Sequence, residues 1–374
     1  MRFTLSSSAL SSRLSILSKV INSKNALPIL DCFLFEVVNN TLTITASDSE
    51  NVMKTSMPLD DSDGEGRFAV NNRTILDAVK ELPEQPLTID VDIQSFVIKV
   101  IYQNGLYNFT GQNAEEYPMA QTMPEGSYTL TLASNVLSDN ITRSVFATAT
   151  EELRPVMNGI YFDLTPDALA IVASDGHKLV RNRNFNIKTE NPTSFILPKK
   201  PANLLKNVLA KDESEVIVRF DDRNAEITFG DTVLLCRLIE GRYPNYNSVI
   251  PQDNPNQLTI DRKVLIGALR RVLPFASESS QLVRLHLEAG KMEISSEDID
   301  FSTSAKEEIP CDYTGSVMSI GFKGTSLSDI LNNLASNEVE LQLADPSRPC
   351  LIVPSEQPEN EDILMLIMPM LLND

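Results

Sequence analysis

The chain has 374 residues, a length that suggests two or three domains. Hydrophobic residues make up 42% and charged residues 22%, which is ordinary for a globular protein, and no apolar run is long enough to span a bilayer. The net charge of −19 argues against nucleic-acid binding unless the cations gather on one surface.

The chain repeats one pattern three times. Segments that begin at Phe33, Gly159 and Val283 each predict a strand, a polar turn, a second strand, an acidic turn and a third strand. Leu42 corresponds to Leu169 and to Met292 in this alignment, at separations of 127 and 123 residues. A period this long indicates duplicated domains rather than a solenoid of short units.

Two amphipathic helices accompany each of these segments, because apolar residues recur there at helical spacing. With their flanks, the six predicted helices cover 5–25, 71–82, 134–146, 196–211, 261–276 and 322–336. More strands close each unit, as in "PLTIDVDIQSFVIKVIY" and "EVIVRFDDRNAEITF". Each repeat therefore predicts an α+β domain with antiparallel sheets. Stretches rich in Pro, Gly and Asn place the domains at 1–125, 126–252 and 253–374.

One short stretch, "AIVASDGHKLV", contains the residue types of a nucleophilic hydrolase: Ser174, Asp175 and His177. The repeat argues against a catalytic triad, because the aligned residues are Ser47-Asp48-Ser49-Glu50 and Ser296-Glu297-Asp298-Ile299. Adjacent residues on one turn also rarely allow the acid to orient the imidazole while the imidazole reaches the hydroxyl. We therefore predict a structural turn used three times, and no catalytic residue.

No other pattern indicates an enzyme, a metal or a cofactor. His286 alternates with leucines on a strand and is expected to be a solvated residue. The HExxH, GxxxxGK[ST] and GxGxxG motifs are absent. The four cysteines lie far apart without a CxxC pair, which predicts reduced thiols in a cytosolic protein and neither a disulfide framework nor a zinc site.

The cations are distributed unevenly. The six helical segments together carry a net charge of +10 in a chain of −19, and none of them is net negative. Solvated lysines on any one helix would be unremarkable, but six such helices predict a basic helical surface and an acidic outer sheet. Such a surface could hold phosphates without reading bases.

The three repeats and several motifs resemble the bacterial DNA polymerase III beta subunits, the sliding clamps, over the whole chain. The motifs are "LPIL" (27–30), "SDGHKL" (174–179), "LPKK" (197–200), "GRYPNY" (241–246) and "IMPML" (367–371). The resemblance implies clamp domains with helices on one face of antiparallel sheets. It further implies a head-to-tail homodimer whose six domains form a ring around double-stranded DNA. Such a processivity factor needs no cofactor, because a separate loader supplies the energy for loading.

The resemblance also implies an apolar groove for short peptides. Its expected partners are the clamp loader, replicative and other polymerases, ligase and mismatch-repair proteins, in the bacterial cytoplasm at the nucleoid and not at a membrane. The groove residues carried over by motif are Met157, Ser174, Gly176, His177, Lys178, Leu179, Pro244, Val249, Leu366, Met368, Pro369, Met370 and Leu372. Methionines suit a surface that adapts to several peptides. Ser248 and Leu371 stand where the family often has arginine, which predicts a more apolar groove.

For DNA contact, the basic positions matching the family are Lys24, Arg73, Arg154, Lys199 and Lys200, although Glu151 and Glu152 beside Arg154 would weaken that contact. The dimer surfaces are predicted at Leu106, Tyr107 and Phe109 in the first domain and at Val272 and Leu273 in the third. Two alternatives stay open at this point: a hydrolase using Ser174 or His177, and a scaffold of repeated domains that binds proteins but not DNA.

Overall fold

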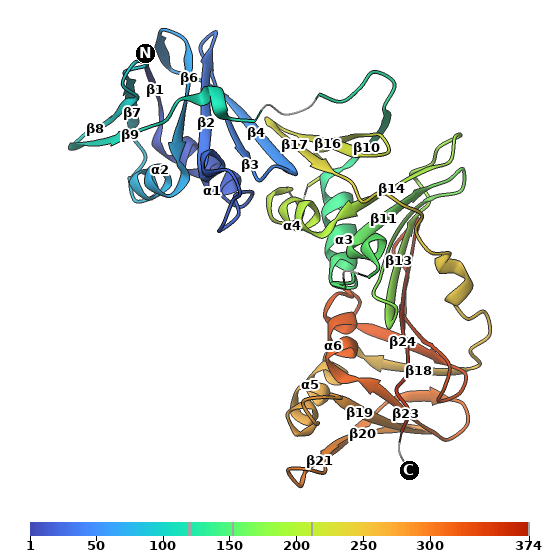
Figure 1. The fold of residues 1–374 in the computed structure, drawn as a ribbon. Helices are drawn as coiled ribbons and strands as arrows, with labels where there is room; N and C mark the ends of the chain where they lie inside the picture. Colours follow the sequence, from blue (N-terminus) through green and yellow to red (C-terminus); the bar gives the residue numbers. More distant parts are fainter. Residues whose placement is uncertain (119–121, 152, 211, 373–374) are drawn as a thin grey trace. The chain divides into compact units, whose positions relative to one another are not determined.

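The computed structural model describes residues 1–118, 122–151, 153–210 and 212–372. The chain forms two compact units, Met1–Ser138 with Asn203–Leu238 and Asp139–Ala202 with Ile239–Asp374. Each unit holds two antiparallel sheets with helices packed against them (Figure 1). No helix within the described ranges is long and apolar enough to cross a bilayer.

The first unit contains a five-stranded and an eight-stranded sheet. In spatial order, the five-stranded sheet consists of β5 (Asp61–Asp63), β1 (Arg2–Ser6), β7 (Pro86–Val91), β8 (Val97–Tyr102) and β9 (Gly105–Thr110). The eight-stranded sheet consists of β10 (Tyr128–Ala133), β15 (Glu215–Phe220), β16 (Asn224–Phe229), β17 (Thr232–Arg237), β4 (Asn51–Pro58), β3 (Thr41–Ser47), β2 (Cys32–Val38) and β6 (Gly66–Asn71).

The second unit contains a nine-stranded and a four-stranded sheet. The nine-stranded sheet consists of β14 (Thr193–Pro198), β11 (Gly159–Leu164), β12 (Leu169–Ser174), β13 (Lys178–Asn184), β26 (Glu361–Ile367), β25 (Cys350–Pro354), β24 (Glu338–Leu343), β18 (Asn256–Asp261) and β22 (Asp312–Thr314). The four-stranded sheet consists of β21 (Thr303–Pro310), β20 (Lys291–Asp298), β19 (Leu282–Glu288) and β23 (Met318–Lys323).

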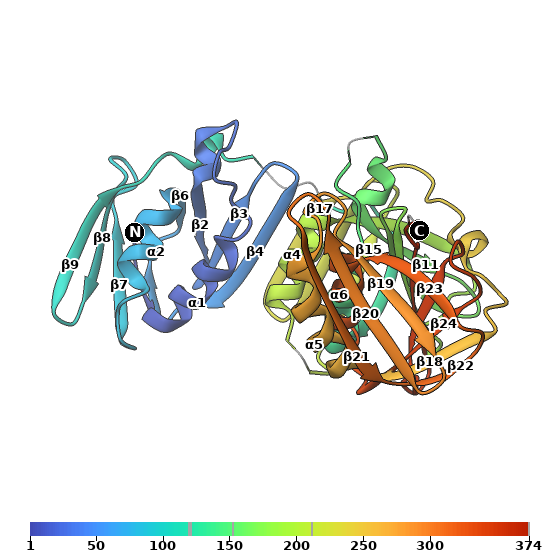
Figure 2. The same cartoon turned by 90° about the horizontal axis from the view of Figure 1, so that it is seen from below.

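The helices lie where the sequence predicts them: α1 (Ser7–Leu17), α2 (Asn72–Val79), α3 (Ser134–Val145), α4 (Lys199–Val208), α5 (Arg262–Val272) and α6 (Gly324–Asn332). Each begins where a strand ends, and short polar side chains cap several of them. Ser6, Asn71 and Asp261 accept hydrogen bonds from first-turn backbone N–H groups, which would otherwise lack partners. In the first unit, α1 and α2 pack together between the strands of the two sheets (Figure 2).

The predicted repeat is confirmed. Leu42, Leu169 and Met292 are fully buried, and each pairs with the strand before it in an equivalent hairpin, opposite Val37, Leu164 and Leu287. The order of elements is also the same in the three repeats, with one helix before the hairpin strands and one after them.

The sheets are not confined to single repeats. The third hairpin strand of the first repeat, β4, pairs antiparallel with the last strand of the second, β17. The equivalent strand β13 pairs with β26, the last strand of the third repeat. We call these two pairings the junction ladders. They merge neighbouring repeats into common sheets, so the two compact units group the strands differently from the three predicted domains.

Buried residues at the second junction ladder should determine the stability of the second unit. Met365 in β26 is fully buried and pairs with Val180 of β13. Met365→Ala is expected to lower the free energy of unfolding by about 2–5 kcal/mol, because it leaves a cavity in the core. Denaturant unfolding measures this. Val317→Ala, at a site with 65% exposure, should change the same quantity by less than about 0.5 kcal/mol.

Candidate functional site

A second apolar cluster lies on the face of the nine-stranded sheet opposite the main core. Its buried members come from five strands of the sheet and from the segment 239–250: Ala170, Val172, Leu179, Ile196, Tyr243, Ile250, Leu351, Leu364 and Leu366. Their neighbours along the strands, such as Ala173, Val180 and Met365, belong to the core beneath the helices. This alternation follows from the period of two along a strand. Leu179 pairs directly with Leu366 across the junction ladder.

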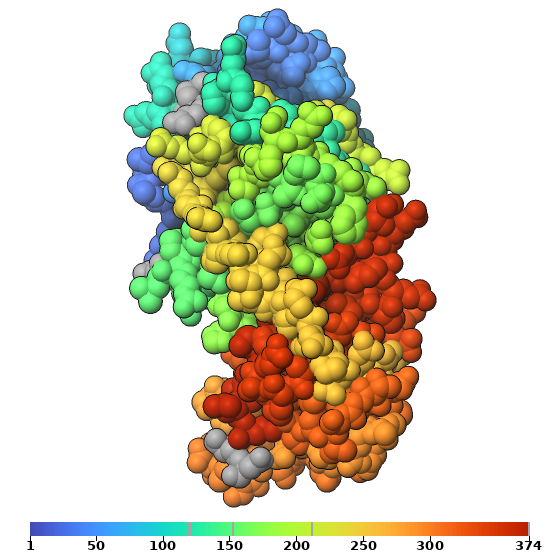
Figure 3. Space-filling model, turned by 90° about the vertical axis from the view of Figure 1, so that its right-hand side faces the viewer, coloured from blue at the N-terminus to red at the C-terminus, as the bar shows by residue number. Residues whose placement is uncertain are grey.

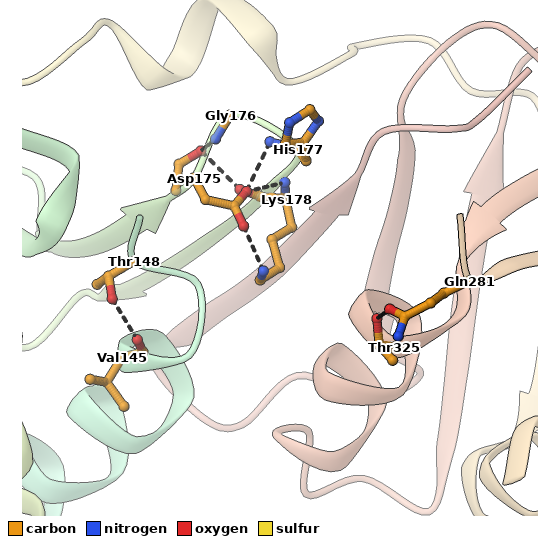
Figure 4. Close-up of polar contacts among 9 residues, drawn as sticks. Val145, Thr148, Asp175, Gly176, His177, Lys178, Gln281 and Thr325 are labelled. Carbon is orange, nitrogen blue, oxygen red and sulfur yellow. Dashed lines mark hydrogen bonds and ion pairs between the residues drawn. The ribbon is translucent and has the colours of Figure 1, made fainter. Parts of the chain in front are cut away.

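The turn at 174–178 stands at the end of this ladder and is held by its own side chains (Figure 4). The Asp175 carboxylate accepts bonds from the backbone N–H groups of His177 and Lys178, both at 2.9 Å, and from the Lys178 ammonium at 2.6 Å. The Ser174 hydroxyl donates to the Lys178 carbonyl at 2.8 Å. Serine and aspartate are thus both engaged by the turn rather than by the imidazole, so these residues form no catalytic triad.

The equivalent turn of the first repeat has the same hydrogen bonds from backbone N–H groups to side chains. The Asp48 carboxylate accepts from Glu50 and Asn51 N–H, and the Ser47 hydroxyl accepts from Ser49 N–H, as Ser174 does from Gly176 N–H. Ser49 and Gly176 both have left-handed backbones, with φ of 82° and 90°. The predicted structural turn is therefore confirmed in two repeats.

The third copy differs from the prediction. Ser296 and Glu297 lie within β20, and the turn comes later, at 299–302. The hairpin is longer by one residue pair, Asp298 opposite Thr303. The Ser296 hydroxyl points inward and donates to the Val272 carbonyl at 2.5 Å. Alignment of the Ser-acid pair missed this, because the pair lies in a strand as readily as in a turn.

The end of the chain runs past the turn to the edge of the other sheet. Met368 N–H donates to the His177 carbonyl at 2.8 Å, and Met370 N–H donates to the Gly321 carbonyl at 2.8 Å. A Cβ at Gly321 would lie 2.9 Å from Leu372 Cδ2, so the absence of a side chain there lets the tail approach. β26 ends at Ile367, two residues before Pro369, which has no N–H to continue a ladder. In Figure 3 the segment 239–250 crosses the surface of the second unit.

Aromatic residues attach this connecting segment to the sheet. Tyr243 stacks on Tyr161 with 4.6 Å between ring centroids, and the Tyr246 hydroxyl donates to Asp163 at 2.8 Å. Burial raises the pKa of the Tyr243 hydroxyl, which keeps it neutral. Of the motif "GRYPNY", only Pro244 was among the predicted groove residues. The two tyrosines, three residues apart, were the signal in the sequence for this attachment to the sheet.

The predicted groove residues divide into a buried floor and an exposed rim. Met157, Ser174, Leu179 and Leu366 are buried. The rim consists of exposed Gly176, His177, Pro244, Val249 and Met368, with Lys178, Pro369, Met370 and Leu372 half-buried. All thirteen belong to the second unit. The predicted groove thus combines buried apolar side chains with exposed residues of the turn, the segment 239–250 and the chain end.

Arg154 lies nearer this surface than its predicted role implies. A Cβ at Gly176 would be 3.2 Å from Arg154 Nη1, which places the guanidinium against the turn. Arg154 thus lies beside the groove residues, and its contact with DNA stays a prediction. Glu152 lies outside the described residues.

The remaining predicted DNA residues lie on or beside helices. Arg73 is exposed on α2, Lys24 is exposed between α1 and β2, and Lys199 and Lys200 open α4. Other helix cations serve the fold instead. Arg262 donates to the carbonyls of Leu331 and Ser336, and Arg271 pairs with Glu307. The positive charge available to bind phosphates is therefore smaller than the net charge of +10 on the six helical segments suggests.

The predicted dimer residues are only partly on the surface. Leu106 is 48% exposed on β9, where Tyr107 and Phe109 are half-buried, and Leu273 is half-buried. Val272 is 1% exposed and belongs to the core beneath α5, so its prediction as a surface residue was wrong. Val272 lies on the buried face of α5. The apolar spacing of the sequence did not show whether this residue belongs to the buried or the exposed face.

Three family models match successive parts of the chain. They describe the N-terminal, central and C-terminal domains of the DNA polymerase III beta subunit, at residues 1–122, 131–245 and 247–371. The chain belongs to the DNA polymerase III beta-subunit family. The family is that of the DNA sliding clamp, a processivity factor and not a catalytic subunit.

Relatives agree over the full length. The beta sliding clamps of Pseudomonas putida and Haemophilus influenzae are 29% and 28% identical to this chain, and each alignment covers 100% of both chains. A crystal structure of a sliding clamp from Pseudomonas aeruginosa bound to griselimycin superposes with a TM-score of 0.93 at 26% identity. The structure of the beta subunit from Thermotoga maritima superposes with a TM-score of 0.90 at 27% identity. Both cover 100% of each chain.

Asp175 allows a test of how the turn is stabilised. Burial opposes its ionisation most strongly, but the bonds from Lys178 and His177 together lower its pKa. Asp175→Asn should therefore cost about 1–2 kcal/mol at pH 7. The depressed pKa stabilises the fold above the ordinary carboxyl pKa of about 3.9, and this contribution is lost as pH falls through the lower folded value. The difference between wild type and variant in unfolding free energy should therefore narrow below pH 4. A difference that stays constant down to pH 2 would contradict this explanation.

Proposed function

We propose that this sliding clamp closes around duplex DNA as a head-to-tail homodimer and binds partner peptides at the groove residues of its second unit. The single observation that carries the dimer is the pattern of the junction ladders. In both, the third hairpin strand of one repeat pairs with the last strand of the next. The third hairpin strand of the third repeat is β21, and the last strand of the first repeat is β9. Both lie at the edges of their sheets.

Pairing of β21 with β9 of a second copy would repeat the same junction. Unpaired edge strands present free backbone donors and acceptors to other chains. Because β21 and β9 belong to different repeats, the contact is head-to-tail, and two copies would close it with two such contacts. Three domains from each copy then give the six-domain ring that the resemblance implies.

The repeats also predict the register of this contact. Leu234 and Cys236 of β17 are buried opposite Met53 and Asn51 of β4. The hairpins place Tyr107 and Phe109 at the positions of Leu234 and Cys236. Tyr107 would then lie opposite Ala305 of the second copy, and Phe109 opposite Thr303. Burial of these two half-buried rings would contribute to dimer stability.

At the groove residues, an apolar peptide would cover a surface that has buried leucines beneath it and flexible methionines at its rim. This chemistry suits short peptide tails of the clamp loader, polymerases, ligase and mismatch-repair proteins. Ser248 donates to the Asn245 carbonyl at 2.7 Å and adds no charge, and Leu371 is 83% exposed. Both support a preference for apolar peptide residues.

Contact with DNA would be weak and independent of sequence, because a closed ring is retained by topology and needs few phosphate contacts. Lys24, Arg73, Lys199 and Lys200 are the proposed contacts. The site of action would be the bacterial cytoplasm, at the nucleoid. No residue of this scheme is required to perform chemistry.

Removing the tail tests the groove. Deletion of 368–374 should lower the affinity for a peptide from the organism's own replicative polymerase by at least tenfold, roughly the effect of losing one or two buried apolar side chains. Fluorescence anisotropy measures the affinity, and sedimentation should show an unchanged dimer. His177→Ala should also lower the affinity for the peptide. Glu50→Ala, at the equivalent position of the first turn, is the matched control. Equal peptide affinity in the truncated protein would place the groove elsewhere.

Charge reversal tests the DNA contact. Lys199→Glu with Lys200→Glu should weaken binding to short duplexes of every sequence alike and reduce the slope of log Kd against log salt by about 2. Lys188→Glu with Arg348→Glu makes the same change in net charge at exposed loop sites and should have a smaller effect. A marked preference for one DNA sequence, or equal effects of both pairs, would refute these contacts.

A further inference from the structure

The hairpin between β20 and β21 ends in an apolar tip, Ile299 to Phe301, that the rest of the chain leaves uncovered. Ile299 is 82% exposed and Phe301 79% exposed. The equivalent tips of the first two repeats are polar, with Asp48 and Glu50 in one and Asp175 and His177 in the other. A hairpin of this type therefore does not need apolar residues at its turn, and the third tip requires another explanation.

The tip is a fixed turn. Phe301 N–H donates to the Asp298 carboxylate at 3.1 Å, and Ser302 N–H donates to the Ile299 carbonyl at 3.3 Å. Ser302 has a left-handed backbone with φ of 53°. The two apolar side chains are thus presented in a preset arrangement, which lowers the entropy lost when they bind.

The two junction ladders show what lies beside such a tip. One residue past the last pair of each ladder, Arg237 N–H donates to the Glu50 carbonyl at 3.0 Å, and Met368 N–H donates to the His177 carbonyl at 2.8 Å. In both cases the tip of one repeat contacts the residue just past the last pair, which is the last residue of β17 in the first ladder and the residue after β26 in the second. At a contact between two copies, the corresponding residue is Thr110, at the end of β9.

An apolar surface lies next to Thr110. Val97 pairs with Thr110 across β8 and β9, and Gly111 N–H donates to the Phe96 carbonyl at 2.7 Å. Val97 is 38% exposed, and Ile93 in the preceding turn is also 38% exposed. The third hairpin is longer by one residue pair, so in the proposed dimer its tip would extend past Thr110 toward this surface. We call Ile93 and Val97 the receiving surface.

We propose that Ile299 and Phe301 form an apolar latch that packs on the receiving surface of a second copy of this chain. The inference rests on the proposed dimer and adds to it a contact that the other two junctions lack. Both intrachain junctions are covalently connected, whereas the contact between copies must close from two free surfaces. The latch supplies apolar area there, and its contribution persists at high salt because it involves no ion pair.

Subunit exchange tests the latch. Copies labelled with a donor or an acceptor fluorophore are mixed, and the growth of energy transfer gives the dissociation rate, while a dilution series in the ultracentrifuge gives the dimer Kd. The double variant Ile299→Ser with Phe301→Ser should raise the Kd by about tenfold or more, mostly through faster dissociation, at 0.1 M and at 1 M salt alike. Val317→Ser, 65% exposed in the same repeat, should leave both quantities unchanged.

A double-mutant cycle identifies the surface that the latch contacts. Val97→Ser alone should also weaken the dimer, and combining it with the tip variant should cost less than the two separate losses together, since both remove the same contact. Thermal unfolding should be nearly unaffected, because all three positions are exposed. A wild-type monomer at micromolar concentration would overturn the dimer and the latch together. A wild-type dimer that keeps its Kd in the tip variant, or additive losses in the cycle, would overturn the latch alone.

Discussion

The antiparallel ladder between β13 and β26 is the interaction on which the functional part of this clamp depends. It joins strands almost two hundred residues apart and buries side chains on both of its faces. One face completes the core beneath the helices. The other carries Leu179 and Leu366, the floor of the apolar cluster around the turn at 174–178. Without this pairing, the turn and the chain end would have no reason to meet.

The same ladder explains why the turns at 48–51 and 174–178, which are equivalent in the repeat, have different surroundings. In the first repeat the turn at 48–51 ends a ladder whose partner strand continues along the chain through Arg237. In the second repeat the partner strand is the last of the chain, and only the short segment 368–372 follows it among the described residues. That segment crosses to Gly321 and lines the surface beside His177. A duplicated structural element thus keeps its bonds from backbone N–H groups to side chains while its surroundings differ.

Charged and apolar side chains have different roles in this protein. Several cations on the predicted helices are occupied by carbonyls or carboxylates of the fold, as Arg262 and Arg271 are. A protein that is retained on DNA by closure needs only a few weak phosphate contacts. Some exposed apolar side chains, such as Val249, Leu106 and Ile299, lie where other polypeptides are proposed to bind, whereas others, such as Leu27 and Val317, do not.

The sequence by itself determined the three repeats, the six helices and the turn, because helical spacing, strand alternation and turn residues are local properties. The family motifs also predicted a set of groove residues, all of which the structure brings into one unit, although the pattern placed the buried Val272 on the surface. Only the tertiary structure decided which strands pair across repeats, how the compact units group them, and that the third turn comes later than its copies. The physical reason is that ladders such as β13 with β26 join distant edges, whose choice of partner depends on the packing of whole sheets and leaves no periodic signal in either strand.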